Sequence, residues 1–460
     1  MTAIENAVPA VSDRLSRWTL LIFACALVNF LLGQALIVAG VTWPEVAFTA
    51  GSTLAAVHLI TLGWLTLLMF GALFQFVPVI TTKPLLNQWL SLAVLILVEF
   101  GLTGMTVGFL ALNRGASGLA RCLPFGGTLV LAGVLLAMGN IVTPLLCSRP
   151  LALPGRFVLA GLAFLLATVL LGFTFALALS VPAFTPLAAP LLASGVGYHV
   201  LAGLGGWFTL TAMGVSYKLL PMFMLAPEER GWWGECVLQF GISGFGLSVI
   251  AGLLSVWRPQ AVLLNAVQHL GWLAIAVAVM AYLIDVLRLY RTRKRARIEL
   301  HNRAACGAFL SLAAALVIAV VLVASHRLAA YAPALVLLVL FGWLSGLGLT
   351  QLYKIVPFLT WITRYGHQLG RDAVPRVQDL VDEARTSPWF VIYFLGVALA
   401  ALGAFINVAY VCRTGAAVSA GATLGLGFEY WRAWRGHYAG RTRPATPIPP
   451  PYLSRGGPAP

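Results

Sequence analysis

Three histidines of this chain fall inside long apolar stretches, where an ionisable side chain is expensive and usually marks a functional site. They are His58, His199 and His269. Imidazole is the usual axial ligand of haem iron and a good ligand for copper, so these residues are candidates for redox chemistry. A second interpretation stays open, in which each imidazole forms a hydrogen bond with a neighbouring helix. We expect the other four histidines to be solvated: His301, His326, His367 and His437.

Two of the three histidines precede a stretch that occurs three times. The copies are GWLTLLMFGALFQFVP (63–78), GWFTLTAMGVSYKLLP (206–221) and GWLSGLGLTQLYKIVP (342–357). His58 lies six residues before the Trp of the first copy and His199 eight before that of the second, while the third copy has no histidine there. A small residue seven positions after the Trp predicts close approach of a neighbouring helix. The final Pro predicts a helix that stops or bends.

The elements that carry these residues are predicted to be transmembrane helices. The chain has 460 residues, of which 60% are hydrophobic and 9% charged, far below the quarter typical of soluble domains. In lipid, long apolar runs must be helical because every backbone polar group needs an internal partner. We predict twelve spans, at about 18–40, 53–80, 87–112, 122–146, 156–180, 187–224, 236–256, 261–287, 304–325, 331–362, 388–411 and 414–431. The stretch 187–224 is too long for one straight span and is expected to begin with an irregular or interfacial segment.

The net charge of +15 is distributed as in a membrane protein. Of the 29 Lys and Arg residues, 22 lie in the termini and in the loops after even-numbered spans. This bias predicts that both termini are cytoplasmic in a bacterial-type inner membrane. The basic loop 288–303 then faces anionic lipid. It lacks a recognition fold, so no nucleic-acid partner is expected.

The spacing of the three copies predicts a threefold internal repeat. Twelve spans divide into three units of four, and the copies fall on spans 2, 6 and 10, the same place in each unit. The predicted fold is therefore an all-α membrane domain at 18–432, with repeats at about 18–146, 156–287 and 304–431. It is preceded by a cytoplasmic segment (1–17), and the Pro- and Gly-rich tail (433–460) is expected to be disordered.

This architecture resembles subunit I of the haem-copper oxidase superfamily, which includes nitric oxide reductases. HLITLGWLTLLMFGALFQFVP (58–78) is similar to the family helix that carries haem-ligand histidines. YHVLAGLGGWFTLTAMGVSYKLLP (198–221) is similar to the sixth helix, whose histidine binds copper. The resemblance covers the twelve spans in architecture, and it is specific at residue level only over these two segments.

The resemblance implies a fold like that of cytochrome c oxidase subunit I and a set of cofactor ligands. His58 corresponds to the ligand of a low-spin haem, in a pore of its own. His199 corresponds to a copper ligand, with His269 and Tyr198 expected beside it. The family also has two adjacent histidines on span 7 and two on span 10, and this chain has none on either span. A standard oxygen-reducing site is therefore not expected.

Three charged residues in predicted spans are further candidates for a functional role. Glu99 is either a proton relay or a neutral acid bonded to a neighbouring helix, with Asn140 as the expected partner. Lys218 and Lys354 each lie three residues before the Pro that ends a copy of the repeat. They either extend to the lipid headgroups or take part in proton entry or anion contact.

Two classes of function remain open. The first is a divergent respiratory subunit that binds haem, with copper as an optional second cofactor, and has a redox, nitric-oxide-handling or gas-sensing role. As an enzyme it would be an oxidoreductase. An electron donor or other membrane subunits would be its partners in the bilayer. The second is a cofactor-free transporter or assembly subunit on the same scaffold, with the charged residues Glu99, Lys218 and Lys354 as its pathway.

Overall fold

The computed structural model describes residues 13–112, 117–227, 232–368 and 374–437, and all regular elements in these ranges are helices. The first unit comprises α1 (Asp13–Val38), α2 (Gly51–His58), η1 (Leu59–Thr66), α3 (Leu67–Thr81), α4 (Trp89–Leu112), α5 (Ser117–Ala120) and α6 (Cys122–Leu146). The second comprises α7 (Leu153–Ser180), α8 (Thr185–Ser194), α9 (Val196–Val200), η2 (Leu201–Thr209), α10 (Leu210–Met224), α11 (Trp232–Ser255) and α12 (Val262–Thr292). The third comprises α13 (Leu300–Ala324), α14 (Leu328–Leu337), η3 (Leu338–Ser345), α15 (Gly346–Tyr365), the short η4 (Gly366–Gln368) and η5 (Val377–Leu380), α16 (Glu383–Phe405) and α17 (Ala409–Arg435).

The chain is a multi-pass membrane protein. Eleven described helical segments are long and apolar enough to cross a bilayer. Each matches a predicted span within about six residues, except that the span predicted to begin at 187 begins at Val196. The twelfth predicted span (414–431) lies within α17, which is not among the eleven. This helix carries four charged residues, Arg413, Glu429, Arg432 and Arg435. The irregular start predicted for 187–224 is confirmed, because the separate short helix α8 precedes α9.

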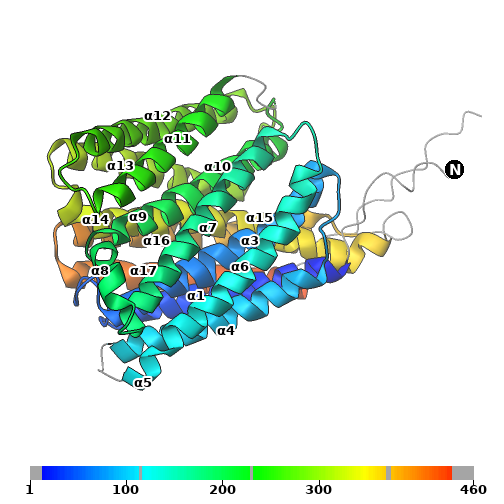
Figure 1. Cartoon of the computed structure of the whole chain (residues 1–460). Coiled ribbons are helices and arrows are strands. Elements are labelled where there is room, and N and C mark those ends of the chain that lie inside the picture. Colours follow the sequence, from blue (N-terminus) through cyan, green and yellow to red (C-terminus); the bar gives the residue numbers. More distant parts are fainter. Residues whose placement is uncertain (1–12, 113–116, 228–231, 369–373, 438–460) are drawn as a thin grey trace, which may run out of the picture.

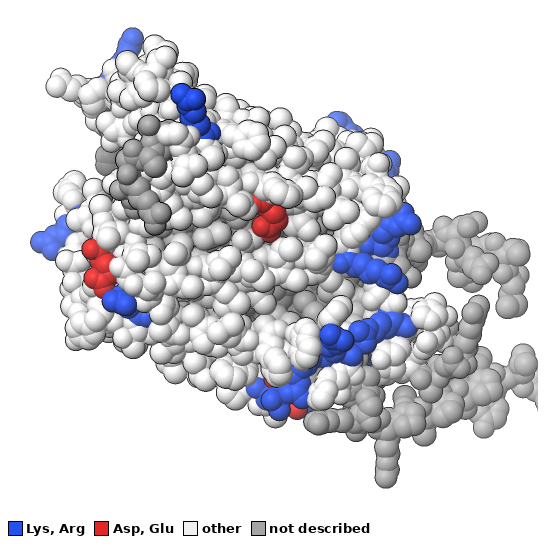
Figure 2. Space-filling model, turned by 90° about the horizontal axis from the view of Figure 1, so that it is seen from below, with Lys and Arg blue, Asp and Glu red and all other residues white. Residues whose placement is uncertain are grey.

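The helices run side by side in one bundle, with α11 and α12 at one side and α1 and α4 at the other (Figure 1). The three segments that contain the repeated stretch form its interior. In their most apolar windows, 67% of the residues are buried in α2–α3, 83% in α9–α10 and 67% in α14–α15, against 28–50% in the other eight spans. Basic side chains crowd toward one end of the bundle, and a broad, sparsely charged belt lies between the two ends (Figure 2).

The outer helices pair through small residues in the same way in each unit. A Cβ atom added to Gly101 of α4 would lie 2.7 Å from the carbonyl oxygen of Gly126 on α6. A Cβ on Gly244 of α11 would lie 2.7 Å from the backbone nitrogen of Ile275 on α12. A Cβ on Gly415 of α17 would lie 2.2 Å from the backbone nitrogen of Ala400 on α16. In each unit, therefore, the third and fourth helices approach so closely that no side chain fits between their backbones.

The repeated Trp residues connect the three units. Each of Trp64, Trp207 and Trp343 has no exposed surface. The indole Nε1 of Trp64 donates to Ser345 Oγ of the third unit at 3.0 Å.

The other two indoles also contact the preceding unit. The ring of Trp207 lies 5.9 Å from that of Phe70 in the first unit. The ring of Trp343 lies 6.1 Å from that of Tyr282 in the second. The Trp of the second unit thus packs against the first unit, and the Trp of the third unit against the second. The Trp of the first unit contacts the third, so the contacts between units close into a ring.

The small residues of the repeat behave as predicted, and the prolines do so in part. A Cβ on Gly71 would lie 2.7 Å from the Phe23 ring of α1, and one on Gly214 would lie 2.2 Å from Phe157 Cβ of α7. Helices α3 and α10 each end three residues after their Pro. Helix α15 instead continues for eight residues beyond Pro357, so the third proline does not stop its helix.

Candidate functional site

Each of the three inner helices contains a π-helical segment at the repeated Gly-Trp. These segments are η1, η2 and η3, and His58 and His199 lie just before the first two. The π-helical turns are rare and occur frequently at functional sites. In two of these segments a threonine hydroxyl donates a hydrogen bond to the carbonyl five residues earlier. Thr66 Oγ1 donates to the Thr61 carbonyl at 3.0 Å, and Thr209 Oγ1 donates to the Leu204 carbonyl at 2.7 Å.

His58 is held by its own helix and by an aromatic ring. Its Nδ1 donates to the backbone carbonyl of Leu54 at 2.8 Å. Its imidazole lies 4.8 Å from the ring of Phe109 on α4. In a neutral imidazole with a proton on Nδ1, the lone pair is on Nε2. No described residue forms a hydrogen bond with Nε2 of His58, so this nitrogen is available as a ligand.

His199 has the same tautomer, fixed by a neighbouring helix. Its Nδ1 donates to the backbone carbonyl of Thr168 on α7 at 3.0 Å. Phe175 packs edge-on against the ring at 5.7 Å, and a Cβ on Gly172 would lie 3.0 Å from His199 Cε1. In metal-ligating histidines, a carbonyl oxygen commonly holds the other ring N–H in this way and fixes the orientation of the ring. Nε2 of His199 also has no hydrogen-bond partner among the described residues.

Both histidines line one cavity of about 190 Å³. The prediction that His58 lies in a separate pore is therefore wrong. The first two inner helices contribute the two imidazoles, and the third contributes the apolar side chains of Val336 and Leu340. The remaining wall is formed by α4, α6, α7 and α8 and is almost entirely apolar.

The cavity presents two imidazole nitrogens and few other polar groups. Carboxylates and thiols do not occur among its lining residues. In the described part of the chain, no group of three or more His, Cys, Asp or Glu side chains is placed to hold a metal ion. A scan against protein-family models and a search of curated proteins both found no match to this chain. The site must therefore be interpreted from its own chemistry.

The two cofactors implied by the resemblance differ in how they fit this cavity. Pockets for drug-sized ligands measure roughly 300–1,000 Å³, and a haem is a large ligand on that scale. The cavity measures about 190 Å³, which is below that range. Span 10, where the family has histidines, offers only Val336 and Leu340 here. A single copper ion is far smaller than a haem, and neutral imidazoles are good copper ligands.

His269 and Tyr198 are not brought into this cavity. His269 is exposed on α12, and its Nδ1 donates to the Asn265 carbonyl at 2.7 Å. Tyr198 accepts a hydrogen bond from Gln268 Nε2 at 3.1 Å and packs against Gly252 of α11. The tyrosine thus connects α9 with α11 and α12. Neither residue lines the cavity that contains His199.

Glu99 contacts α1 and not the expected Asn140. The amide Nδ2 of Asn29 donates to Glu99 Oε1 at 2.8 Å. A Cβ on Gly63 would lie 2.6 Å from Asn29 Cβ, so this glycine of the repeat makes room for the asparagine. Asn140 instead accepts a hydrogen bond from the backbone nitrogen of Asn87 at 3.0 Å. The interpretation of Glu99 as an acid bonded to a neighbouring helix therefore agrees with its contacts.

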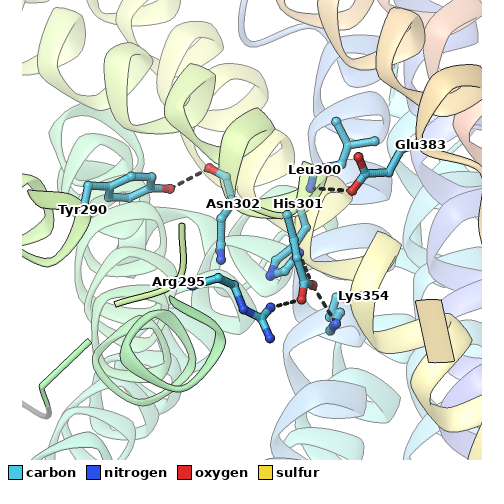
Figure 3. A network of polar contacts seen from close by, with 8 residues as sticks. Tyr290, Arg295, Leu300, His301, Asn302, Lys354 and Glu383 are labelled. Atoms are coloured by element: carbon cyan, nitrogen blue, oxygen red, sulfur yellow. Dashed lines mark hydrogen bonds and ion pairs between the residues drawn. The ribbon is translucent and has the colours of Figure 1, made fainter. Parts of the chain in front are cut away.

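Lys354 belongs to an ionic cluster that the sequence analysis missed. Its Nζ donates to Glu299 Oε2 at 2.6 Å, and Arg295 pairs with the other oxygen of the same carboxylate. The ring of His301 lies beside them, with Nδ1 3.5 Å from Glu299 Oε2. Figure 3 shows Arg295, His301 and Lys354 converging from three elements.

The histidines outside the predicted spans differ in how exposed they are. His301 has no exposed surface, so the prediction that it is solvated is wrong. The reason is that α13 begins at Leu300, which places His301 against Phe223 of α10 with ring centroids 4.9 Å apart. Lys218 is half-buried on α10. The other three histidines, His326, His367 and His437, are exposed as predicted.

Proposed function

We propose that this chain is a divergent, oxidase subunit I-like membrane protein whose cavity binds one copper ion through His58 and His199. The observation that carries the proposal is that two histidines, whose Nε2 atoms form no hydrogen bond with a described residue, line one apolar cavity. Both Nδ1 atoms are engaged by carbonyl oxygens, so each ring presents its lone pair on the remaining nitrogen. Of the two cofactors that the family resemblance implies, copper is the smaller, and it is the one that we propose for a cavity of about 190 Å³.

The role that follows is redox chemistry or gas handling, and not standard oxygen reduction. A copper ion held by two imidazoles would supply a one-electron centre with affinity for small diatomic ligands. The apolar wall favours small apolar molecules, because such cavities stay dry and bind apolar guests. Nitric oxide, carbon monoxide and oxygen meet this requirement. The chain's own residues would hold the metal, orient the imidazoles and exclude water.

The test compares metal content among variants of the purified full-length protein. We expect about one copper per chain in the wild type, and at least a tenfold loss of copper affinity in His58→Ala and in His199→Ala. His269→Ala is the matched control, because this histidine is exposed and outside the cavity. Equal copper binding by all four proteins would contradict the proposal, as would stoichiometric haem in the absorption spectrum.

The transport alternative has less support from the contacts. It requires Glu99, Lys218 and Lys354 to form a pathway. Glu99 bonds to Asn29 of α1, whereas Lys354 is paired with Glu299 in the ionic cluster. These residues are therefore engaged in separate local contacts. Ion-driven flux in vesicles that is abolished by Glu99→Gln, in protein without copper, would favour transport over the copper proposal.

A further inference from the structure

A second cavity lies on the lipid-facing side of the bundle and has no part in the histidine site. It is a groove of about 630 Å³ between α1, α15 and α17. Its walls are mostly apolar, with Leu20, Ala24 and Leu27 on α1 and Leu352 and Val356 on α15. Because α1 and α15 are membrane-spanning helices, bilayer lipid is the molecule that the groove meets.

One end of the groove is basic. Arg17 near the start of α1 and Arg364 near the end of α15 both line it. Arg364 Nη1 donates to the Arg435 carbonyl at 2.9 Å, which brings the end of α17 to the same place. The guanidinium of Arg435 lies 5.5 Å from the ring of Trp431, and this Trp also lines the groove.

Carboxylates do not occur among the lining residues of the groove. Glu429, on the same helix as Trp431, pairs with Arg385 at 2.8 Å and has a side chain only 4% exposed. The described lining of the basic end thus carries arginines and no carboxylate, and it complements an anionic group. Trp side chains are enriched at the level of lipid headgroups, so Trp431 and Trp434 agree with this placement.

The opposite end of the groove closes at Leu27 and Gly427. A Cβ on Gly427 would lie 2.9 Å from Leu27 Cδ2, so α1 and α17 meet there. The helical run from Arg17 to Leu27 is about 15 Å long at about 1.5 Å per residue. The hydrocarbon core of a bilayer is about 30 Å thick, so one leaflet is about 15 Å deep. The groove thus has the length of an acyl chain in one leaflet.

We propose that this groove binds one anionic phospholipid, with its phosphate at Arg17 and Arg364 and an acyl chain between α1, α15 and α17. The charge of the basic end selects the headgroup, and the depth of the groove selects a membrane lipid over a free anion. Basic pockets between transmembrane helices bind anionic lipid headgroups in this way. The proposal does not depend on the copper site.

The experiment measures retention of phosphatidylglycerol and phosphatidylcholine with the same acyl chains by native mass spectrometry of the full-length protein. We expect the wild type to retain one phosphatidylglycerol in preference to phosphatidylcholine. Each basic group near an anionic headgroup contributes about a factor of five, so Arg17→Gln with Arg364→Gln should weaken retention about 25-fold. Arg291→Gln is the matched control, because Arg291 is an exposed basic residue on α12 that does not line the groove.

A second variant tests the acyl-chain part of the site. Ala24 is exposed within the groove, so Ala24→Trp fills the space without disturbing the buried core. It should abolish retention while the melting temperature stays within a few degrees of the wild type. Unchanged retention in Ala24→Trp, or displacement of the lipid by inorganic phosphate, would overturn the acyl-chain part and with it the proposal.

Other outcomes would overturn the proposal as a whole. Equal retention of the two lipids would remove the role of charge. Equal retention by the double Arg variant and by Arg291→Gln would remove the role of the two groove arginines. Lipid that binds only after deletion of residues 441–460 would identify the chain's own tail as the occupant of the groove.

Discussion

Packing of Gly172 against the His199 ring is expected to control copper affinity without a change in either proposed metal ligand. In Gly172→Ala the new Cβ would lie 3.0 Å from His199 Cε1, closer than the ordinary contact distance of 3.4–4 Å. The imidazole must then move by a few tenths of an ångström. It is tied to the Thr168 carbonyl at 3.0 Å, so the shift changes the direction of Nε2. Both proposed ligands remain present, and only their placement changes.

The expected effect is a loss of copper affinity of about tenfold, or about 1.4 kcal/mol. Changes in the groups that orient metal ligands typically lower metal affinity about 10–100-fold, and this value is at the low end of that range. The fold itself should survive. Overpacking costs about 1–3 kcal/mol, and replacing a helical Gly by Ala returns about 1 kcal/mol. Titration of the metal-free protein with a competing copper chelator gives the affinity, and thermal unfolding in detergent gives the stability.

Gly139→Ala is the matched control, because a Cβ on this glycine of α6 meets nothing within 4 Å. It should leave copper affinity unchanged. If Gly172→Ala binds copper as tightly as the wild type while His199→Ala does not, packing at Gly172 does not position the imidazole. If the Gly139 variant loses affinity equally, the effect is general, and the assignment of Gly172 fails.

Two further predictions concern stability, and both are read from thermal unfolding of the purified protein. Ser345→Ala removes the acceptor for Trp64 Nε1 and should cost about 0.5–2 kcal/mol, the range for hydrogen bonds between membrane helices, whereas Ser325→Ala at an exposed helix end should cost less. Glu299→Gln should lower the stability of the folded protein by about 2 kcal/mol. The side chain of Lys354 is only 22% exposed, and the substitution removes the carboxylate that lies 2.6 Å from its Nζ. Lys354→Met in the Glu299→Gln background should cost less than in the wild type, and strictly additive losses would contradict direct coupling.

The helices could be predicted from the sequence because lipid leaves an apolar run few alternatives. The backbone must satisfy its own hydrogen bonds, so the apolar runs correspond to α1, α4, α6 and the other spans within a few residues. The same reasoning fixes depth along a helix but not the direction in which a side chain points. His269 shows the difference, because its depth resembles that of His199 while its helix turns it to the outside.

Contacts between segments distant in the chain could not be predicted from local pattern. Glu99 lies seventy residues from Asn29, and the choice between Asn29 and Asn140 depends on which helix packs on α4. The burial of His301 likewise depends on a distant segment, because its ring packs against Phe223 of α10. A basic run predicts a solvated surface, and this one contains a buried histidine because α13 begins within it.

The repeat explains why the proposed site has two imidazoles and not more. Three inner helices surround the interior, and each has a π-helical segment at its Gly-Trp. Histidines precede this segment in the first and second units, while the third unit has Leu337 six residues before its Trp. The third inner helix therefore contributes only Val336 and Leu340 to the cavity. An imidazole added at Val336 or Leu340 would give the cavity its third nitrogen, so Val336→His or Leu340→His should raise copper affinity if the metal lies between the three helices. Unchanged affinity in both variants would place the metal away from the third helix.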